Sequence, residues 1–142
     1  MAAFIKIYVH AVWSTKDRYP YLIRQSKDGL IAHVKEYAQS KNIHLDHING
    51  GPEHLHALIS MSADQNIATI MNLLKGESSH WINKQGFFQD KFSWQDEYFA
   101  VSVGESQIDI IRNYIRNQEN HHQKKTFQQE YDEFMRNYKF EG

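Results

Sequence analysis

The amino-acid sequence predicts an α+β fold, in which a four-stranded antiparallel sheet is covered by helices on one face. Two observations support this prediction. Apolar and polar residues alternate along four short segments, and apolar residues recur every three or four positions along two longer segments between them. The resulting order of strand, helix, strand, strand, helix, strand is that of the split βαβ arrangement of a ferredoxin-like fold. Such an order leaves the second face of the sheet available to other elements.

The first strand is expected over residues 4–14. Its alternation places two sets of side chains on opposite faces, namely Ile5, Ile7, Val9, Ala11 and Trp13 on one face and Lys6, Tyr8 and His10 on the other. After a loop around Pro20, a first helix is expected to end before Lys41. Its apolar residues follow helical spacing: Leu30, Ile31, Val34, Tyr37 and Ala38.

Two further strands, over residues 43–49 and 53–61, are expected to form a hairpin through the turn sequence Gly50-Gly51-Pro52. A second helix follows, with Asp64 as its N-terminal cap, and continues past Gly76 through Trp81. The fourth strand is expected over residues 98–103.

Gly104 ends the fourth strand, and Ser106 with Asp109 is expected to cap a third helix, whose apolar residues are Ile108, Ile111 and Ile115. The tail from residue 121 to residue 142 is predicted to be a C-terminal helical arm. No repeat and no low-complexity linker divides the sequence. Residues 1–142 are therefore interpreted as a single domain.

The composition argues against several classes of protein. The chain has 142 residues, 41% of them hydrophobic, and a formal net charge of −1, so neither disorder nor an overall basic surface is indicated. It contains no cysteine, which leaves nitrogen and oxygen ligands for any metal. No apolar run approaches the ~18 residues of a membrane span, and the first residues lack a signal-peptide pattern. A cytoplasmic location is expected.

The pair His54 and His56 is the feature that is most informative about function. In an extended strand alternate side chains share a face, so the two imidazoles project together, with α-carbons roughly 6.6 Å apart. They are close enough to bind one metal ion. The apolar residues of the same strand, Leu55, Ala57, Ile59 and Met61, lie on the other face. Nine histidines in the chain make a chance pair a real alternative, so a metal site needs a further ligand from elsewhere.

The expected third helix carries Tyr114 and Gln118, which are four positions apart and therefore on one helical face. If this helix packs against the histidine face, it brings a phenol and an amide oxygen to the same metal. The alternative is that Tyr114 packs beside Ile111 and Ile115 as an ordinary helix residue. Spacing alone does not separate these alternatives.

Four motifs, taken in order, resemble those of a known family. They are the pair His54-Leu55-His56, the segments Leu-Lys-Gly-Glu-Ser-Ser-His-Trp-Ile-Asn over 74–83 and Phe-Ser-Trp-Gln-Asp-Glu-Tyr-Phe-Ala-Val-Ser-Val over 92–103, and Tyr114-Ile115-x-Asn117-Gln118. Together they resemble the small single-tyrosine HUH transposases of the insertion sequence 200/605 type, the IS200-like family. The resemblance spans residues 4–118.

This resemblance implies a DNA transposase and endonuclease that cleaves and rejoins single-stranded DNA and recognises hairpins at the ends of a mobile element. It implies Tyr114 as the catalytic nucleophile, forming a covalent 5′-phosphotyrosine intermediate. It implies His54, His56 and Gln118 as ligands of a divalent metal, magnesium or manganese. It also implies a homodimer, in which the tyrosine helix of one subunit, turning at Gly104, completes the histidine site of the other.

DNA binding would have to come from local charge and stacking, because the net charge is close to zero. The candidates for phosphate contacts are Lys75, Arg112 and Arg116, with Lys124 and Lys125 in the tail, and those for base stacking are Trp81 and Trp94. Each has an ordinary alternative as a solvated cation or a core aromatic. No general base is assigned, because Glu53, Asp46 and His47 lie near the histidine pair without a pattern that gives them a role.

Other functions remain open from the sequence. The chain is alternatively a domesticated or inactive module that only binds single-stranded nucleic acid, or a metal-dependent hydrolase without covalent capture. An RNA-binding domain of the same strand order is disfavoured, because residues 98–103 lack the glycine-aromatic signature of such domains. Attachment of DNA to the denatured protein separates the covalent mechanism from the first two alternatives.

Overall fold

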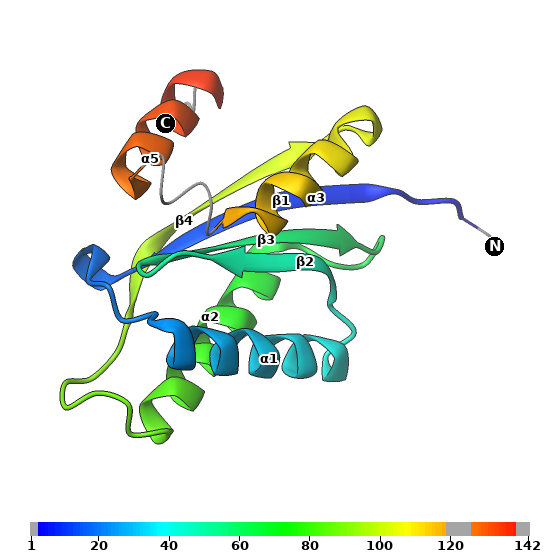
Figure 1. Cartoon of the computed structure of the whole chain (residues 1–142). Coiled ribbons are helices and arrows are strands. Elements are labelled where there is room, and N and C mark those ends of the chain that lie inside the picture. The colour runs from blue at the N-terminus through cyan, green and yellow to red at the C-terminus, as the bar shows by residue number, and fades with distance from the viewer. Residues whose placement is uncertain (1–2, 119–125, 139–142) are drawn as a thin grey trace.

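The computed structural model describes residues 3–118 and 126–138, and within them strands and helices follow the predicted order (Figure 1). In chain order the elements are β1 (Ile7–Thr15), α1 (Arg24–Ser40), β2 (His44–Gly50), β3 (His54–Met61), α2 (Ile67–Lys84), β4 (Trp94–Val103), α3 (Ile108–Arg116) and α5 (Phe127–Tyr138), with 3-10 turns η1 (Lys16–Arg18) and η2 (Glu105–Gln107).

The four strands form one sheet in the order β2-β3-β1-β4, and all neighbours are antiparallel. β1 lies beside β3 in a continuous register that runs from Ile7 opposite Met61 to Ser14 opposite His54. Helices α1 and α2 cover one face of the sheet, and α3 and α5 lie on the other (Figure 1). The predicted α+β fold of ferredoxin-like strand order, with a tyrosine-bearing helix after the fourth strand, is confirmed.

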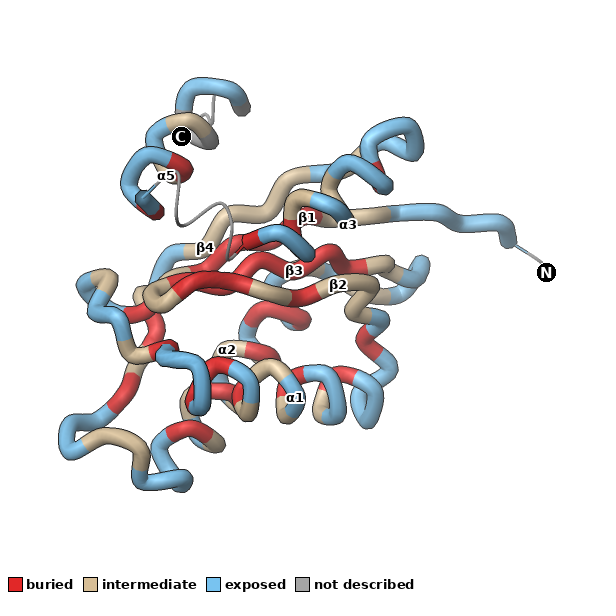
Figure 2. Tube along the Cα trace, viewed as in Figure 1, coloured by how far each residue is buried: buried red, intermediate tan, exposed pale blue. Residues whose placement is uncertain are grey.

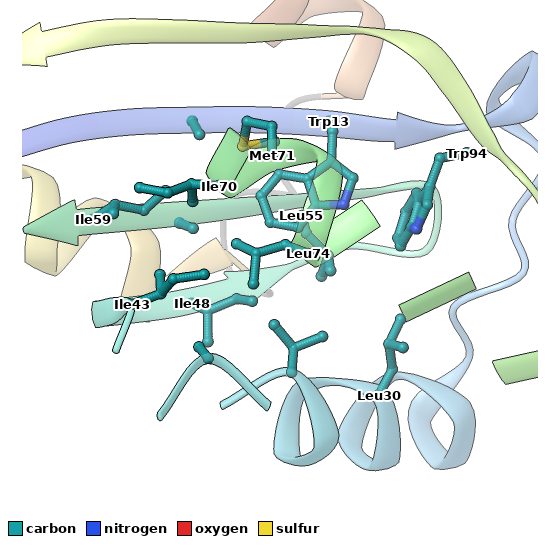
Figure 3. Packing of buried hydrophobic residues seen from close by; sticks show 14 of the residues in the cluster. Trp13, Leu30, Ile43, Ile48, Leu55, Ile59, Ile70, Met71, Leu74 and Trp94 are labelled. Atoms are coloured by element: carbon teal, nitrogen blue, oxygen red, sulfur yellow. The ribbon is translucent and has the colours of Figure 1, made fainter. Parts of the chain in front are cut away.

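The main hydrophobic core lies between the sheet and helices α1 and α2 (Figure 3). Strand residues such as Trp13 and Leu55 meet Leu30 of α1 there, and all three are buried. The indole N–H of Trp94 donates a 2.8 Å hydrogen bond to Ser78 Oγ, so this buried polar group has a partner. The face predicted to be apolar from the alternation of β1 and β3 is the face that this core uses.

A smaller cluster lies on the opposite face of the sheet. It consists of Leu58 of β3 and the α3 residues Ile108 and Ile115, all of them buried. Figure 2 shows that the buried positions follow the strands, and that the outer sides of α3 and α5 are exposed. Because Leu58 and His56 share one strand face, the packing of α3 over Leu58 also brings it over the histidine.

Two strand boundaries differ from the prediction by more than one residue. β1 begins at Ile7 instead of residue 4, and Phe4 is completely exposed. β4 begins at Trp94 instead of Tyr98, because Trp94 pairs with Thr15 across a shift in register. A shift of this kind interrupts the alternation of apolar residues, which is why the pattern missed the start of the strand.

The predicted cap of the second helix is wrong. α2 begins after Asn66, whose side-chain oxygen accepts a 2.8 Å hydrogen bond from the backbone N–H of Thr69. Asp64 instead accepts a 2.6 Å hydrogen bond from Ser62 Oγ in the preceding turn. Both residue types favour caps, so composition alone could not choose between them.

The predicted Ser106–Asp109 capping pair is also wrong. The turn η2 leads directly into α3, whose N-cap residue Gln107 makes no side-chain capping bond, and Asp109 instead pairs with Arg112. Helix α5 is the described part of the predicted C-terminal arm, whereas residues 121–125 and 139–142 lie outside the described residues. None of the helices in the described ranges is long and apolar enough to cross a membrane.

Candidate active site

His54 and His56 project from β3 onto the face that α3 and α5 cover. Their positions follow from the pleat, because Val12 opposite His56 and Ser14 opposite His54 put both imidazoles on the face away from the main core. The predicted register is therefore correct. The sequence placed the pair on the polar side of the strand, but both side chains are completely buried. They are buried because helices pack over this face, and the alternation of residues along a strand does not predict such packing.

Helix α3 brings Tyr114 to the histidines, and Gln118 lies just past the end of the helix, after the C-cap Asn117. Gln118 Oε1 lies 3.1 Å from His54 Nε2, and the Tyr114 ring meets the His56 ring edge-on, with centroids 5.3 Å apart. Gln118 itself is completely buried. The structure thus brings together all four residues that the resemblance named as nucleophile and ligands.

The docking of α3 has an ionic component as well as its small apolar cluster. The guanidinium of Arg112 donates two hydrogen bonds to Asp46 of β2, of 2.9 Å from Nε and 2.7 Å from Nη2. This bidentate geometry is the strongest that the two groups form. Asn49 of β2 adds a 3.2 Å hydrogen bond to the carbonyl of Arg116 at the end of the helix. Together these contacts orient the helix that carries Tyr114.

A further acidic side chain, Glu130 of α5, reaches the same centre. Its Oε2 lies 3.4 Å from His54 Nε2 and 3.5 Å from His56 Nε2, and the residue is only 3% exposed. Phe127, one turn earlier, stacks on His54 with centroids 4.2 Å apart and the rings within 14° of parallel. Sequence reasoning missed Glu130, because nothing in the charged tail distinguishes it from its neighbours Asp132 and Glu133.

The geometry of these groups fits a divalent metal. His54, His56 and Glu130 offer ligand atoms that all lie within 4.8 Å of one another. Metal–ligand bonds of about 2.1 Å place neighbouring ligand atoms about 3.0–3.4 Å apart, depending on the coordination geometry. His54 Nε2 lies 3.1 Å from Gln118 Oε1 and 3.4 Å from Glu130 Oε2, and these two separations are within this range. The 3.5 Å from His56 Nε2 to Glu130 Oε2 is slightly longer. Two imidazoles, an amide and a carboxylate form a donor set suited to such an ion.

Each histidine has a hydrogen-bonding partner on the ring nitrogen that faces away from Glu130. His54 Nδ1 lies 3.0 Å from Glu53 Oε1, and His56 Nδ1 lies 2.9 Å from His10 Nε2. Partners of this kind fix the orientation of metal-binding imidazoles. The Nε2 atoms of both histidines consequently point to the space that Glu130 and Gln118 share.

Burial and charge set the protonation of the site. Burial raises the pKa of the Tyr114 phenol above its ordinary value, and the negative charge of Glu130 raises it further. Burial alone would raise the pKa of Glu130, but its hydrogen bonds to His54 and His56 lower this pKa. Burial alone would lower the pKa of His54, but its hydrogen bonds to Glu130 and Glu53 raise this pKa. Burial, followed by the charge of His56, lowers the pKa of His10 to about 3.

The residues proposed from the sequence for DNA binding lie in two places. Arg112 and Arg116 are on α3 beside Tyr114, where Arg112 bonds to Asp46 and Arg116 Nε lies 3.1 Å from His47 Nε2. Lys75 and Trp81 are on α2, on the other side of the sheet (Figure 1).

The α2 residues and the remaining candidates have other contacts. Lys75 donates to the carbonyls of Gln95 and Asp96, and Trp81 stacks on His33 with centroids 5.0 Å apart. Trp94 is in the main core. Lys124 and Lys125 lie outside the described residues.

The sheet of ferredoxin-like order carries two histidines on one strand, the following helix carries a tyrosine, and a glutamine lies just past the end of that helix. This is the arrangement expected of a single-tyrosine HUH transposase. The family described as Transposase IS200 like matches residues 3–118, and the chain belongs to it. The predicted family is confirmed. Within it, the chain is 25% identical over 115 residues to the ISDra2 transposase TnpA of Deinococcus radiodurans, covering 77% of this chain and 81% of that relative.

Two solved structures share the fold. A crystal structure from Deinococcus radiodurans of a protein assigned as a transposase has a TM-score of 0.66 and 24% identity, covering 83% of this chain and 95% of the other. A REP-associated tyrosine transposase bound to a REP hairpin has a TM-score of 0.65 and 14% identity, covering 86% of this chain and 72% of the other.

Proposed function

We propose that this chain cleaves and rejoins single-stranded DNA at hairpin-bearing ends through a covalent 5′-phosphotyrosine intermediate. The observation that carries the proposal is the convergence of Tyr114 of α3, and of Gln118 just past its end, with His54 and His56 of β3. From the sequence, Tyr114 could equally have been an ordinary packing residue of the helix. In the structure its ring meets the His56 ring. The structural likeness to a tyrosine transposase bound to a REP hairpin supports DNA hairpins as the class of substrate.

The proposed cleavage is an in-line displacement at phosphorus. The Tyr114 oxygen forms a bond to phosphorus while the bond from phosphorus to the 3′ oxygen breaks. The proton lost by the phenol is balanced by the proton that the leaving 3′ oxygen gains. Rejoining reverses these changes: a 3′ hydroxyl attacks the phosphotyrosine and the phenol is regenerated. One phosphoester bond is exchanged for another in each step, so no ATP is needed.

His54, His56, Gln118 and Glu130 are the residues that would hold magnesium or manganese. A bound ion of this kind neutralises charge on the scissile phosphate and orients it. Burial and the charge of Glu130 raise the pKa of the Tyr114 phenol, so the phenol is protonated in the metal-free chain. No group in the described residues is assigned as a general base.

An aromatic cavity beside the site suits a base of the single strand. It has a volume of about 330 Å³ and includes Phe99, Phe127 and Tyr131 in its lining. The guanidinium of Arg18 lies 4.7 Å from the Tyr131 ring centroid and adds positive charge to the same cavity. Aromatic side chains beside a cation are typical of single-strand binding sites.

Lys75, Arg112, Arg116 and Trp81 remain the proposed DNA contacts, and the geometry supports them unequally. Arg116 is exposed beside Tyr114 and donates only to neutral side chains, Asn113 and His47. Arg112 is held by the carboxylate of Asp46, and Lys75 donates to two backbone carbonyls. Trp81 would contact DNA only if the single strand reaches the face of the sheet that α2 covers. Loss of one phosphate contact lowers the salt dependence of DNA binding by about one unit of slope, so Arg116→Gln is expected to show this reduction most clearly.

We also propose a homodimer in which the α3 helices exchange between subunits. Gly104 precedes α3 with φ −69° and ψ 152°, a conformation open to any residue, so the described arrangement does not itself require glycine there. If α3 instead packs on the partner subunit, the backbone at Gly104 must turn differently, and glycine permits conformations that other residues do not. The test mixes Tyr114→Phe chains with His56→Ala chains: an adduct on the His56→Ala chain requires exchange, and its absence supports a site completed within one chain.

The decisive experiment offers the genomic flanks of the gene as single strands with magnesium or manganese. A protein–DNA adduct that survives denaturation is expected, and Tyr114→Phe is expected to abolish it while Tyr131→Phe retains it. An adduct that persists in Tyr114→Phe would overturn the nucleophile assignment and direct attention to Tyr131 or Tyr138. Cleavage without an adduct would identify a hydrolase, and binding without cleavage would identify an inactive module.

A further inference from the structure

His10 of β1 has no part in the reaction described above, although it lies against the proposed metal site. It is 1% exposed, and its Nε2 lies 2.9 Å from His56 Nδ1. The two ring planes are within 25° of parallel and their centroids are 5.1 Å apart, as expected for imidazoles joined edge to edge by a hydrogen bond. The contact is set by the sheet, because His10 and Val12 lie on the same face of β1 and Val12 is directly opposite His56.

The two ring nitrogens of His56 face different neighbours. Nε2 lies 3.5 Å from Glu130 Oε2, on the side where the metal ligands converge, and Nδ1 faces His10. A neutral imidazole has one N–H and one lone pair. If Nε2 binds the metal, the proton must be on Nδ1, and in a buried site that N–H needs an acceptor.

We propose that His10 is a positioning residue, whose Nε2 accepts the Nδ1–H of His56 and so directs the Nε2 lone pair of His56 to the metal. This inference rests on the metal centre proposed above. It requires His10 to carry its own proton on Nδ1. The rings of both histidines are then fixed in orientation as well as in tautomer.

The other metal histidine shows why the acceptor at position 10 is an imidazole. His54 Nδ1 has a carboxylate partner, Glu53, at 3.0 Å. Glu130 already brings a second negative charge to the centre. A neutral acceptor orients His56 without adding a third carboxylate to a buried site, where each unpaired charge is costly.

The test compares His10→Gln, His10→Leu and the control Val12→Ala in the full-length chain. Glutamine keeps an acceptor near the position of Nε2, and leucine removes it. Val12→Ala creates a packing defect directly opposite His56 without touching the hydrogen bond. The measurements are Mn²⁺ affinity by titration calorimetry and the ¹⁵N shifts of the His56 ring in the metal-free protein, which identify the protonated nitrogen.

We expect the wild-type His56 to be protonated on Nδ1, with the same tautomer in His10→Gln. Mn²⁺ affinity is expected to fall by about 10-fold or more in His10→Leu and by much less in His10→Gln and Val12→Ala. A His56 protonated on Nε2, or equal losses in His10→Leu and Val12→Ala, would overturn the inference. If His10→Leu does not fold, the inference is still tested by two measurements: the tautomer of His56 in the wild type and the Mn²⁺ affinity of His10→Gln.

The same experiment separates this inference from the proposed function. If the wild type does not bind Mn²⁺, the metal centre fails, and the tautomer of His56 still tests the role of His10 in the metal-free chain. If the wild type binds Mn²⁺ and His10→Leu binds it equally well, only the role of His10 fails.

Discussion

The amide oxygen of Gln118 lies 3.1 Å from Nε2 of His54, although the two residues are 64 positions apart in the chain. This contact joins the segment just past the end of α3 to β3, a central strand of the sheet. It is the point at which the two halves of the proposed site meet, and it identifies which substitutions test the site most directly.

Replacement of Gln118 by leucine is expected to lower Mn²⁺ affinity by about 10-fold or more, because an oxygen ligand is lost from a buried centre. Gln118→Glu retains an oxygen ligand and should bind at least as tightly. The neighbouring exposed residue Asn117 provides the control, and Asn117→Ala should bind normally. Titration calorimetry measures all three. Unchanged affinity in Gln118→Leu would show that Gln118 is only a hydrogen-bonding partner of His54.

Glu130→Gln should also lower Mn²⁺ affinity, by about 10-fold or more, because the variant keeps the shape of the side chain and loses its charge. Asp132→Asn is the matched control, since Asp132 is on the same helix but exposed, and hydrogen-bonded to Gln128. The same calorimetric titration distinguishes them. Equal affinities in the two variants would exclude Glu130 as a ligand.

The Asp46–Arg112 pair predicts a dependence of stability on pH. Arg112 lowers the pKa of Asp46 from 3.8 to about 2. Because the pKa is lowered in the folded chain, the pair stabilises the fold fully above about pH 4, and this contribution is lost as the pH falls toward 2. The loss is on the order of 1–2 kcal/mol, nearer the lower value because Arg112 is partly exposed.

Denaturant unfolding between pH 5 and pH 2 is the measurement, with Asp46→Asn expected to remove this component. Asp109 provides a control, because it also lies 2.9 Å from Arg112 but its side chain is 88% exposed. Asp109→Asn should leave the pH profile close to that of the wild type. A profile that Asp109→Asn alters as much as Asp46→Asn would assign the effect to general surface charge.

Gly50→Ala is expected to destabilise the chain by about 1–3 kcal/mol and to weaken metal binding, because the added methyl group cannot be accommodated. A Cβ at Gly50 would lie 2.1 Å from the carbonyl oxygen of His54, so the hairpin must shift at the residue that carries a ligand. In α2, a Cβ at Gly76 would meet no described atom within 4 Å.

Gly76→Ala is therefore expected to raise stability by about 0.8–1 kcal/mol through helix propensity alone. Thermal unfolding and Mn²⁺ titration distinguish the two glycine variants. A Gly50→Ala protein as stable as the wild type would contradict the close packing of the hairpin turn against β3.

The sequence predicted what depends on local periodicity. Alternation placed His54 and His56 on one strand face, and helical spacing placed Tyr114 and Gln118 one turn apart. Whether these two faces meet depends on tertiary packing. Spacing alone therefore could not say whether Tyr114 belongs to the site or only packs in the helix, and its role was implied by the four motifs taken together. The caps at Asp64 and Ser106 were wrong because several neighbouring polar residues compete for each helix start.

Glu130 could not be predicted for a different reason. Its position depends on the packing of α5, where Phe127 stacks on His54 and Arg18 lies over the rings of Phe127 and Tyr131. These contacts join residues 73 to 113 positions apart, and no spacing rule within the tail anticipates them. The burial of the histidine pair was missed for the same reason.

The sheet separates the small cluster of Leu58, Ile108 and Ile115 from the main hydrophobic core. The free energy that keeps Tyr114 in place is therefore supplied largely by a few side chains whose loss leaves the larger core intact. Detachment of α3 would be a local opening event, visible as fast amide exchange in that helix beside slow exchange in the strands. Under the proposed function, substitutions in this small cluster would change activity more than global stability, and substitutions in the main core would do the reverse.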